Sequence, residues 1–496
     1  MPGVNVTTAV RTGPVGTGDI VAGQVFMAGE AERGSVTAPT LLRSFSDYTT
    51  YYGNYQTGNL YAHVKTYFDE GGTRCYVQRV LGSGSATGAI TLNDASSSAT
   101  MVVTAKNPGA WAANLDVQVA AADVAGFKVK IYLDDVLLTT TRDLTSVADA
   151  IDVLNTSSDV GHLIVVSDNA TSSANPATVA ATALSSGSDG SAVNDAGRVT
   201  GLSLFGENLK SGAVCIPGAN GSTIWNGLRD HAEAYNRVAL CSFASGDAAS
   251  TAKTNASAYY TDAKASYMAF YWPHVKVNAP AAGELATGTS STGAATVTVS
   301  PESYAAAART RAIQVATGPW RAGAGLVSAA RTVTDLAQEV SPTAGDLLDD
   351  ARINALRKIG SSIRVYGARS ISNDEANWRY ITQRDTINYL VYGIQDRMEM
   401  YVFSTIDSRG NLFGRIRASI KGFLDPIRVA GGLYEAYDDD NRLIDPGYSV
   451  VVDSTINPAS QLAGGLVKAQ VGVRVSGVAD LIQVTISKSN LTTPVI

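Results

Sequence analysis

Residues 222–243, STIWNGLRDHAEAYNRVALCSF, contain the pattern that decides the fold class. Ser222-Thr223 can cap a helix that we expect to continue through Asn236. The apolar run Val238 to Phe243 follows directly and has the composition of a buried strand. A further helix and the apolar strand Tyr267 to Tyr271 repeat this order. Helices alternating with apolar strands predict an α/β core.

The sequence on the N-terminal side of this core contains a second globular part and an insertion. Strand-like runs at Val25 to Ala28 and Cys75 to Val80 flank a helical stretch, so we assign residues 24–82 to the same body. Residues 83–199 are rich in Ser, Thr, Ala and Gly, carry short β-type runs and have linker-like flanks. This composition predicts an inserted, mostly-β outer domain.

The C-terminal side combines helices with a small sheet. Trp378 to Arg397 and Asn411 to Arg428 have apolar residues at helical spacing on one face. Val471 and Val473 lie on one face of an alternating strand, and five residues containing Gly477 lead to a second apolar run, Leu481 to Ile486. This spacing predicts a β-hairpin.

These patterns together predict a multidomain protein of the α+β and α/β classes. We expect the following segments: an extended N-terminal arm at 1–23, an α/β middle domain formed by 24–82 and 200–345, an inserted mostly-β outer domain at 83–199, a C-terminal domain of helices and a small antiparallel sheet at 346–486, and a C-terminal arm at 487–496.

The amino-acid composition indicates which kinds of molecule the protein binds. The 496 residues include 38 Lys and Arg and 44 Asp and Glu, a net charge of −6, which argues against nucleic-acid binding. Charged residues make up 17%, below the roughly 25% of ordinary soluble domains, so much of the surface is expected to face protein. No apolar run approaches a membrane span and the start lacks a signal peptide pattern, so we expect no membrane insertion and synthesis in a cytoplasm.

The sequence contains no motif for catalysis. The four histidines have no metal-ligand spacing, and there is neither a phosphate-binding P-loop nor a Gly-x-Ser-x-Gly nucleophile turn. The acidic run Asp438 to Asp440 lacks the Gly and Glu of a calcium loop. We expect no catalytic residue, no metal and no cofactor, and therefore no enzyme. A carbohydrate-active enzyme stays open as a distant alternative, because paired carboxylates can be neighbours in space alone.

Two further sets of residues have alternative interpretations. Cys75, Cys215 and Cys241 form no CxxC pair; buried reduced thiols are expected, and a disulfide between subunits is the alternative. On the helix from Asn411, at about 100° per residue, Arg417 and Lys421 fall together beside the apolar arc. They form either a solvated basic face or an electrostatic contact to an acidic partner.

Several motifs, in this order, resemble the contractile tail sheath family, and the resemblance covers nearly the whole chain. The motifs that carry it include Ala28-Gly29-Glu30-Ala31-Glu32-Arg33-Gly34, Lys106-Asn107-Pro108-Gly109-Ala110-Trp111, Tyr271-Trp272-Pro273-His274-Val275, Gly318-Pro319-Trp320-Arg321-Ala322-Gly323 and Val365-Tyr366-Gly367-Ala368-Arg369.

The resemblance implies a structural subunit that stacks as hexameric rings around an inner tail tube. Contraction of this helical polymer drives the tube through a target envelope to deliver a genome or an effector. The implied partners are other copies of the chain, the tube protein, and baseplate and tail terminator proteins. The implied location is a virion tail assembled in a bacterial cytoplasm. A tube or baseplate protein of the same machine is the nearest alternative.

The strands near both ends of the chain are the expected sites of polymerisation. A two-stranded hairpin is marginal alone, so its edges can take a strand from a neighbouring subunit. The residues expected to exchange are Val4, Val6, Val471, Val473, Ile482, Val484 and Ile486. Arg417 and Lys421 are the expected contacts to the tube.

Overall fold

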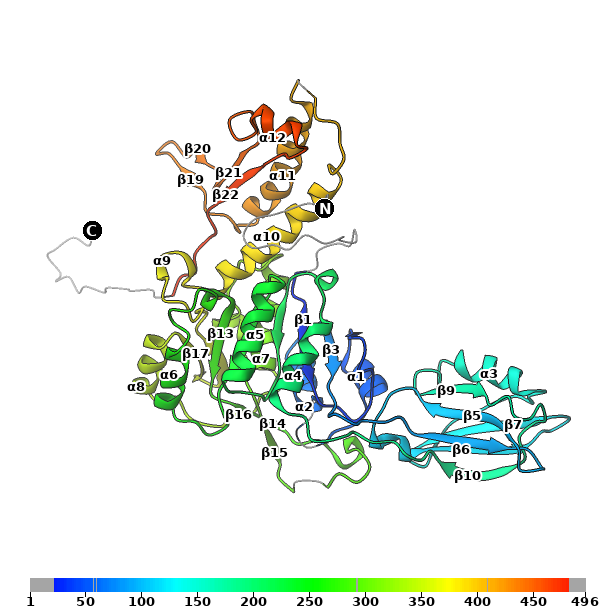
Figure 1. Ribbon diagram of the computed structural model, residues 1–496. Helices are drawn as coiled ribbons and strands as arrows, with labels where there is room; N and C mark the ends of the chain where they lie inside the picture. Colours follow the sequence, from blue (N-terminus) through cyan, green and yellow to red (C-terminus); the bar gives the residue numbers. More distant parts are fainter. Residues whose placement is uncertain (1–21, 57, 59, 291–292, 408, 481–496) are drawn as a thin grey trace.

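The structure is a computed structural model that describes residues 22–56, 58, 60–290, 293–407 and 409–480. Figure 1 shows three parts: a central α/β body, an outer lobe on one side of it, and a C-terminal region at one end. The expected Val4, Val6, Ile482, Val484 and Ile486 lie outside the described residues.

The body is built on an eight-stranded sheet in the order β18-β17-β13-β12-β11-β1-β3-β2. The six strands from β17 to β3 are parallel, and β18 and β2 pair antiparallel at the two edges. This confirms the α/β core. The bounds are β1 Val25–Gly29, β2 Thr40–Leu42, β3 Cys75–Arg79, β11 Ala213–Cys215, β12 Val238–Ser242, β13 Met268–Trp272, β17 Ile353–Ile359 and β18 Ser362–Tyr366.

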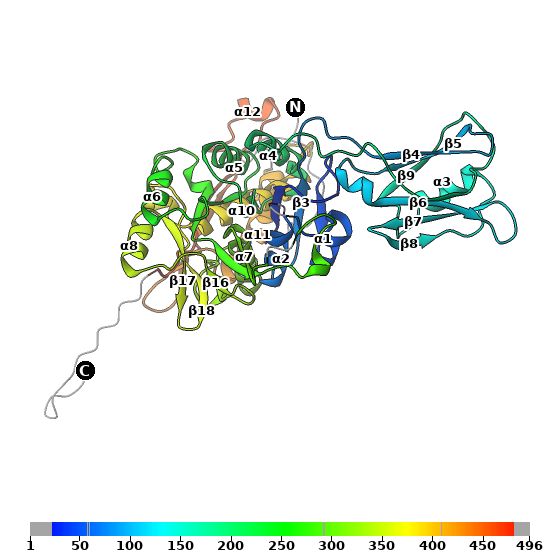
Figure 2. The same ribbon diagram turned by 90° about the horizontal axis from the view of Figure 1, so that it is seen from below.

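Helices cover both faces of the sheet (Figure 2), which explains why its central strands are apolar throughout. Val25 and Met27 of β1 face one layer and Phe26 and Ala28 face the other, because successive strand residues point to opposite sides. The first layer contains α1 Phe45–Tyr52, α2 Tyr61–Asp69 and α7 Glu302–Ala316, and the second contains α4 Asp195–Gly201, α5 Ser222–Ala234, α6 Ala249–Ser257 and α8 Pro342–Asp350.

One local prediction about α5 is wrong. Gly221, with a φ of 100°, is the N-cap, and no side chain caps the helix. Glycine adopts this backbone conformation without the steric cost that a side chain would impose, so Ser222 becomes the first helical residue instead of the cap.

The outer lobe, which lies within residues 83–199, consists of two sheets that enclose one core. The strand β7 shows strict alternation of buried and half-buried residues, as a strand with one face in a core should. The sheets have the orders β4-β5-β9 and β10-β6-β7-β8. The bounds are β4 Ala89–Asn93, β5 Ala99–Ala105, β6 Leu115–Ala121, β7 Phe127–Leu133, β8 Val136–Thr140, α3 Val147–Asn155, β9 Ile164–Asp168 and β10 Val179–Ala183.

Arg79, at the end of β3, joins the outer lobe to the body. Its side chain is fully buried. Nε donates to the carbonyl of Ala31 at 2.9 Å, and the guanidinium also donates to the Pro108 carbonyl at 2.5 Å and to Asp189 Oδ1 at 3.0 Å. Ala31 belongs to the body, whereas Pro108 and Asp189 belong to the outer lobe, so one buried cation holds both parts.

The C-terminal region contains two long helices and two small sheets. The expected helix 378–397 is divided, because Tyr380 is extended and the backbone N–H of Ile381 bonds to the Ala368 carbonyl at 3.0 Å. Pro426 lies within α11 without ending it. The bounds are α9 Glu375–Trp378, α10 Ile381–Glu399, α11 Asn411–Val429, β19 Ala436–Tyr437, β20 Leu443–Asp445, β21 Tyr448–Val451, α12 Ala459–Ala463 and β22 Gln470–Val473.

Short elements complete the described chain. A three-stranded sheet has the order β15-β14-β16, with β14 Val275–Asn278, β15 Thr296–Val299 and β16 Asp335–Leu336. The 3-10 helices are η1 Ala110–Asn114, η2 Leu202–Leu204, η3 Glu207–Leu209, η4 Ala265–Tyr267, η5 Ala282–Glu284 and η6 Gly325–Ser328.

Glu302 is an unusual buried acid at the start of α7. It is 1% exposed, and the Ser242 hydroxyl donates to Oε1 at 2.5 Å, while Oε2 has no partner among the described residues. Burial raises the pKa of Glu302 from 4.5 to about 7. The unfolded chain ionises at a lower pH than the folded chain, so this group lowers stability as the pH rises from about 4.5 to about 7.

Titration of Glu302 should therefore lower the free energy of unfolding of the wild type by on the order of 3 kcal/mol between pH 5 and pH 8. The variant Glu302→Gln lacks this titrating group and should not show the decrease. Denaturant unfolding at both pH values measures this, with the wild type as reference. The comparison between variant and wild type matters because His231 and His274, whose pKa values burial lowers to about 2 and about 4, titrate in the opposite sense. An equal pH dependence in both proteins would contradict the assignment.

Candidate functional site: an open strand edge beside the C-terminal helices

The apolar faces of α10 and α11 pack together and are covered by the sheet of β21 and β22. Leu390 on α10 and Ile416 and Ile420 on α11 are buried in this core. Val471 and Val473 of β22 are half-buried and pack against the same core. Their side chains therefore stabilise the subunit itself. This agrees with the expected strand, in which Val471 and Val473 share one face.

The described partner of β22 differs from the expected one. β22 pairs antiparallel with β21, with Val471 opposite Val450 and Val473 opposite Tyr448. The expected second strand, Leu481 to Ile486, lies outside the described residues. β21 is not predicted from the sequence, because its short Tyr448–Val451 run follows Gly447 and an acidic loop and gives only a weak strand signal.

The opposite edge of β22 is open among the described residues. Arg474 N donates to the Gly447 carbonyl at 2.7 Å, so even-numbered residues of β22 bond to β21. In an antiparallel pair the backbone groups of the intervening residues point the other way. The N–H and C=O of Val471 and Val473 therefore face an edge that no other described strand covers. Such an edge is a template for a further strand.

The two basic residues on α11 have different roles. Arg417 is half-buried and donates from a terminal guanidinium nitrogen to the Val452 carbonyl at 2.5 Å. It therefore holds the end of β21 against α11. Lys421 is exposed and has no ion pair or hydrogen bond to any described residue. Of the two, only Lys421 is free within the described chain to meet a partner. Arg428 is engaged with Asp425 and Glu435.

The structure describes the surroundings of all three cysteines. Cys75, Cys215 and Cys241 are free thiols at 0%, 0% and 1% exposure. Burial raises the pKa of each thiol above its usual value. The expectation of buried thiols is confirmed, and a disulfide between subunits would require one of these cysteines to reach the surface.

Two ion pairs of low exposure hold α10 on the α/β body. Arg309 of α7 makes two hydrogen bonds to Asp385, at 2.6 and 2.8 Å. Lys210 Nζ lies 2.6 Å from Asp396 Oδ1. Because α10 continues into the C-terminal region, these pairs couple that region mechanically to the body (Figure 1).

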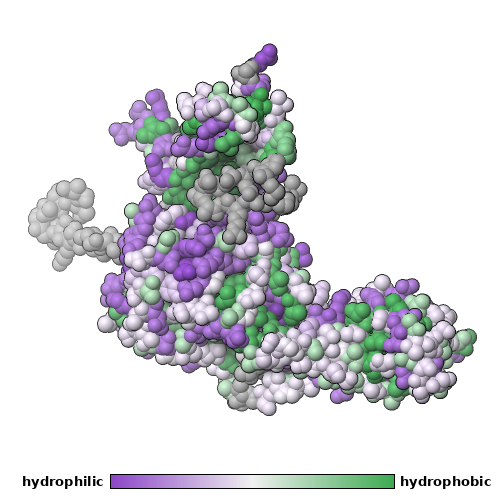
Figure 3. Space-filling view, viewed as in Figure 1, coloured by the Kyte–Doolittle hydropathy of each residue, from purple (hydrophilic) through white to green (hydrophobic). Residues whose placement is uncertain are grey.

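Exposed apolar side chains gather in the C-terminal region. Figure 3 shows a hydrophobic area on its visible face above a largely hydrophilic part of the body. Exposed apolar patches of this kind mark protein contacts. The exposed apolar residues of this region are Met400, Phe403, Val429, Tyr434, Tyr437, Leu443, Ile444 and Leu466.

The described residues contain no cluster of three or more His, Cys, Asp or Glu side chains placed to hold a metal ion. Among the helices of the described chain, none combines the length and apolar character needed to cross a membrane.

Comparison with known proteins identifies the architecture. No protein-family model matches the chain, and no curated protein matches it. Solved structures do. The sheath tail protein of Listeria innocua is similar at a TM-score of 0.62 and 12% identity, with 89% of this chain and 91% of that chain covered.

Two contractile injection systems contain similar chains. A chain of the contracted baseplate of the anti-feeding prophage has a TM-score of 0.58 and 17% identity, with 98% of this chain and 97% of that chain covered. A chain of the contracted sheath complex of the extracellular injection system PVC has a TM-score of 0.54 and 15% identity, with 98% of both chains covered.

The layered α/β body, the outer lobe and the C-terminal region thus define a protein of the contractile-sheath fold class. The chain is similar over nearly its whole length to the sheath tail protein of Listeria innocua and to a chain of the PVC sheath complex.

Proposed function

We propose that this chain is the sheath subunit of a contractile tail or injection system and has no enzymatic role. The observation that carries the proposal is the similarity, over 98% of the chain, to a chain of a contracted sheath complex. The alternatives considered from the sequence, a tube or baseplate protein and a carbohydrate-active enzyme, are not favoured by the comparisons.

The open edge of β22 is the proposed site of polymerisation. An incoming strand from another copy pairs with the N–H and C=O groups of Val471 and Val473. The arm residues Val4 and Val6, and the strand Leu481 to Ile486 with Ile482, Val484 and Ile486, are the proposed exchanged segments. A head-to-tail contact of this kind does not close on itself, so it propagates into rings and a helix.

The three parts of the subunit have separate proposed roles. Of the expected domain 346–486, the part that follows β18 faces the tube and polymerises, whereas β17 and β18 belong to the sheet of the body. The middle domain, 24–82 plus 200–345, forms the sheath wall, and 83–199 lies outside, with arms at 1–23 and 487–496. Contraction packs the bodies more tightly and buries more apolar surface. The ion pairs on α10 transmit the movement of each body to its C-terminal region.

The proposed partners are further copies in hexameric rings, an inner tube, a baseplate and a tail terminator, within a particle assembled in a bacterial cytoplasm. Lys421 is the proposed contact to an acidic tube, and Arg417 supports it by fixing β21 against α11.

Lys421→Glu should leave the subunit folded and weaken its co-assembly with its tube by about tenfold at low salt, because a rim charge acts through electrostatic complementarity. Co-sedimentation with the purified tube protein measures the effect. Lys358→Glu, another exposed lysine, is the matched control for net charge. Equal co-sedimentation of the two variants would exclude Lys421 as the contact.

Negative-stain electron microscopy of the purified chain at rising concentration tests the function itself. We expect long hollow cylinders, either from the chain alone or after co-expression with its tube protein. Dispersed monomers under both conditions would refute the sheath assignment.

A further inference from the structure

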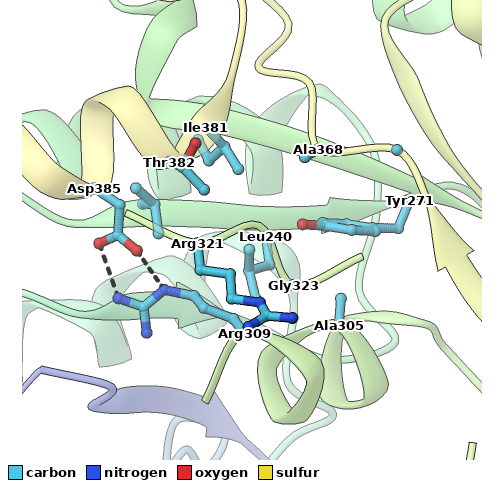
Figure 4. A pocket seen from close by; sticks show the side chains of 12 residues that line it. Leu240, Tyr271, Ala305, Arg309, Arg321, Gly323, Ala368, Ile381, Thr382 and Asp385 are labelled. Atoms are coloured by element: carbon cyan, nitrogen blue, oxygen red, sulfur yellow. Dashed lines mark hydrogen bonds and ion pairs between the residues drawn. The ribbon is translucent and has the colours of Figure 1, made fainter. Parts of the chain in front are cut away.

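A small pocket lies where the N-terminus of α10 meets the α/β body (Figure 4). Its walls come from segments far apart in the sequence: β12, β13, α7, the loop after α7, the loop after β18 and α10. The residues that line it include Leu240, Tyr271, Ala305, Arg309, Arg321, Thr382 and Asp385.

Tyr271 directs an unpaired hydroxyl into this pocket. The residue is 7% exposed, and its hydroxyl makes no hydrogen bond to any described residue. Figure 4 shows the oxygen pointing from β13 toward the centre of the pocket. Burial raises the pKa of Tyr271 above its usual value, so the group stays protonated and is available as a donor. The hydroxyl lines the pocket and is free to donate to a ligand there.

The charges around the pocket leave a net positive balance. Asp385 is satisfied by the two hydrogen bonds from Arg309. Arg321 also lines the pocket, is exposed, and forms no ion pair within the described chain. Two guanidinium groups therefore face one carboxylate. The N-terminus of the 19-residue helix α10 adds partial positive charge at the same place.

Further groups define the chemistry of the ligand. Thr382, 5% exposed in the first turn of α10, has a hydroxyl with no partner in the described part of the chain. Leu240 and Ala305 supply apolar wall. The Arg321 guanidinium and both hydroxyls can donate to an anion, and the small size and apolar wall favour a carboxylate on a short aliphatic stem over phosphate.

We propose that this pocket binds a small carboxylate, with the Arg321 guanidinium and the Tyr271 hydroxyl as the donors to its oxygens. The carboxylate comes either from a free short-chain acid or from an acidic side chain of a second copy. Binding of a free acid needs only the folded subunit, whereas binding of a side chain from a second copy rests on the proposed polymerisation.

A titration of the full-length protein into ¹³C-labelled acetate, at ionic strength held constant with chloride, tests the proposal through the acetate line width. We expect saturable broadening with the wild type. Arg321→Gln and Tyr271→Phe should each bind at least tenfold more weakly, because one charged or one neutral donor is lost. Arg43→Gln, which removes an exposed arginine from the end of β2, is the matched control and should bind as the wild type does.

Broadening that does not saturate, or equal broadening with Arg321→Gln and Arg43→Gln, would overturn the proposal. The variant Tyr271→Phe changes no charge, so weaker acetate binding by this variant cannot result from a long-range charge effect. Measurements of polymerisation then distinguish the two sources of the carboxylate. Slower polymerisation of the wild type in saturating acetate, together with poor polymerisation of Arg321→Gln, supports an acidic side chain from another copy. Unchanged polymerisation supports a free carboxylate.

Discussion

Val473→Pro should abolish growth of the polymer and leave the subunit folded. The N–H of Val473 faces the open edge of β22, so its removal breaks no hydrogen bond to β21. Proline cannot donate to an incoming strand, and its ring obstructs the pairing. We expect the polymer pelleted by ultracentrifugation to fall by at least tenfold, with the circular dichroism spectrum unchanged.

Val473→Ala is the matched control, because it removes the same side-chain packing against the helical core but retains the N–H. It should polymerise nearly as the wild type does, although its stability falls by about 1 kcal/mol for the lost methyl groups of a half-buried valine. Normal polymers from the proline variant would refute strand exchange at this edge. Loss of polymer in both variants would assign the effect to packing.

Arg79→Met should lower the free energy of unfolding by about 3–5 kcal/mol, the usual cost of breaking a buried ionic network by removing one partner. The fully buried guanidinium donates to carbonyls in the body and in the outer lobe, and methionine leaves these acceptors unpaired. We also expect proteolysis to begin at the junction near Gly82, because the outer lobe loses its attachment.

Asp189→Asn provides the comparison. Asp189 is half exposed, and asparagine keeps an oxygen that accepts from Arg79, so the free energy of unfolding should change by less than about 1 kcal/mol. Chemical denaturation and limited proteolysis of both variants measure these effects. If the two variants were equally stable, Arg79 would not hold the lobe as the contacts indicate.

The α/β core, the mostly-β character of the outer lobe and the two C-terminal helices could be predicted from local patterns. Val238 to Phe243 is apolar because both faces of its sheet are covered by helices, and this burial leaves a continuous signal in the sequence. The helix from Asn411 shows its apolar stripe for a related reason, since only one face is buried. Periodicity of this kind depends on near neighbours and can be read without a structure.

Pairing partners and polar contacts depended on the tertiary structure. Periodicity correctly placed Arg417 beside the apolar arc but could not show that the carbonyl of Val452 lies next to it. In the described chain β22 pairs with β21, whereas the partner expected from the sequence, Leu481 to Ile486, lies outside the described residues.

The pocket proposed to bind a carboxylate also depended on the tertiary structure. Tyr271, Arg321 and Thr382 each give an ordinary local signal, and their donors meet only because the sheet, the loop after α7 and α10 converge. The sequence alone thus determined which segments are buried, since burial selects residue type position by position. Only the tertiary structure decided which polar groups meet, since that depends on the packing of segments 76 to 186 residues apart along the chain.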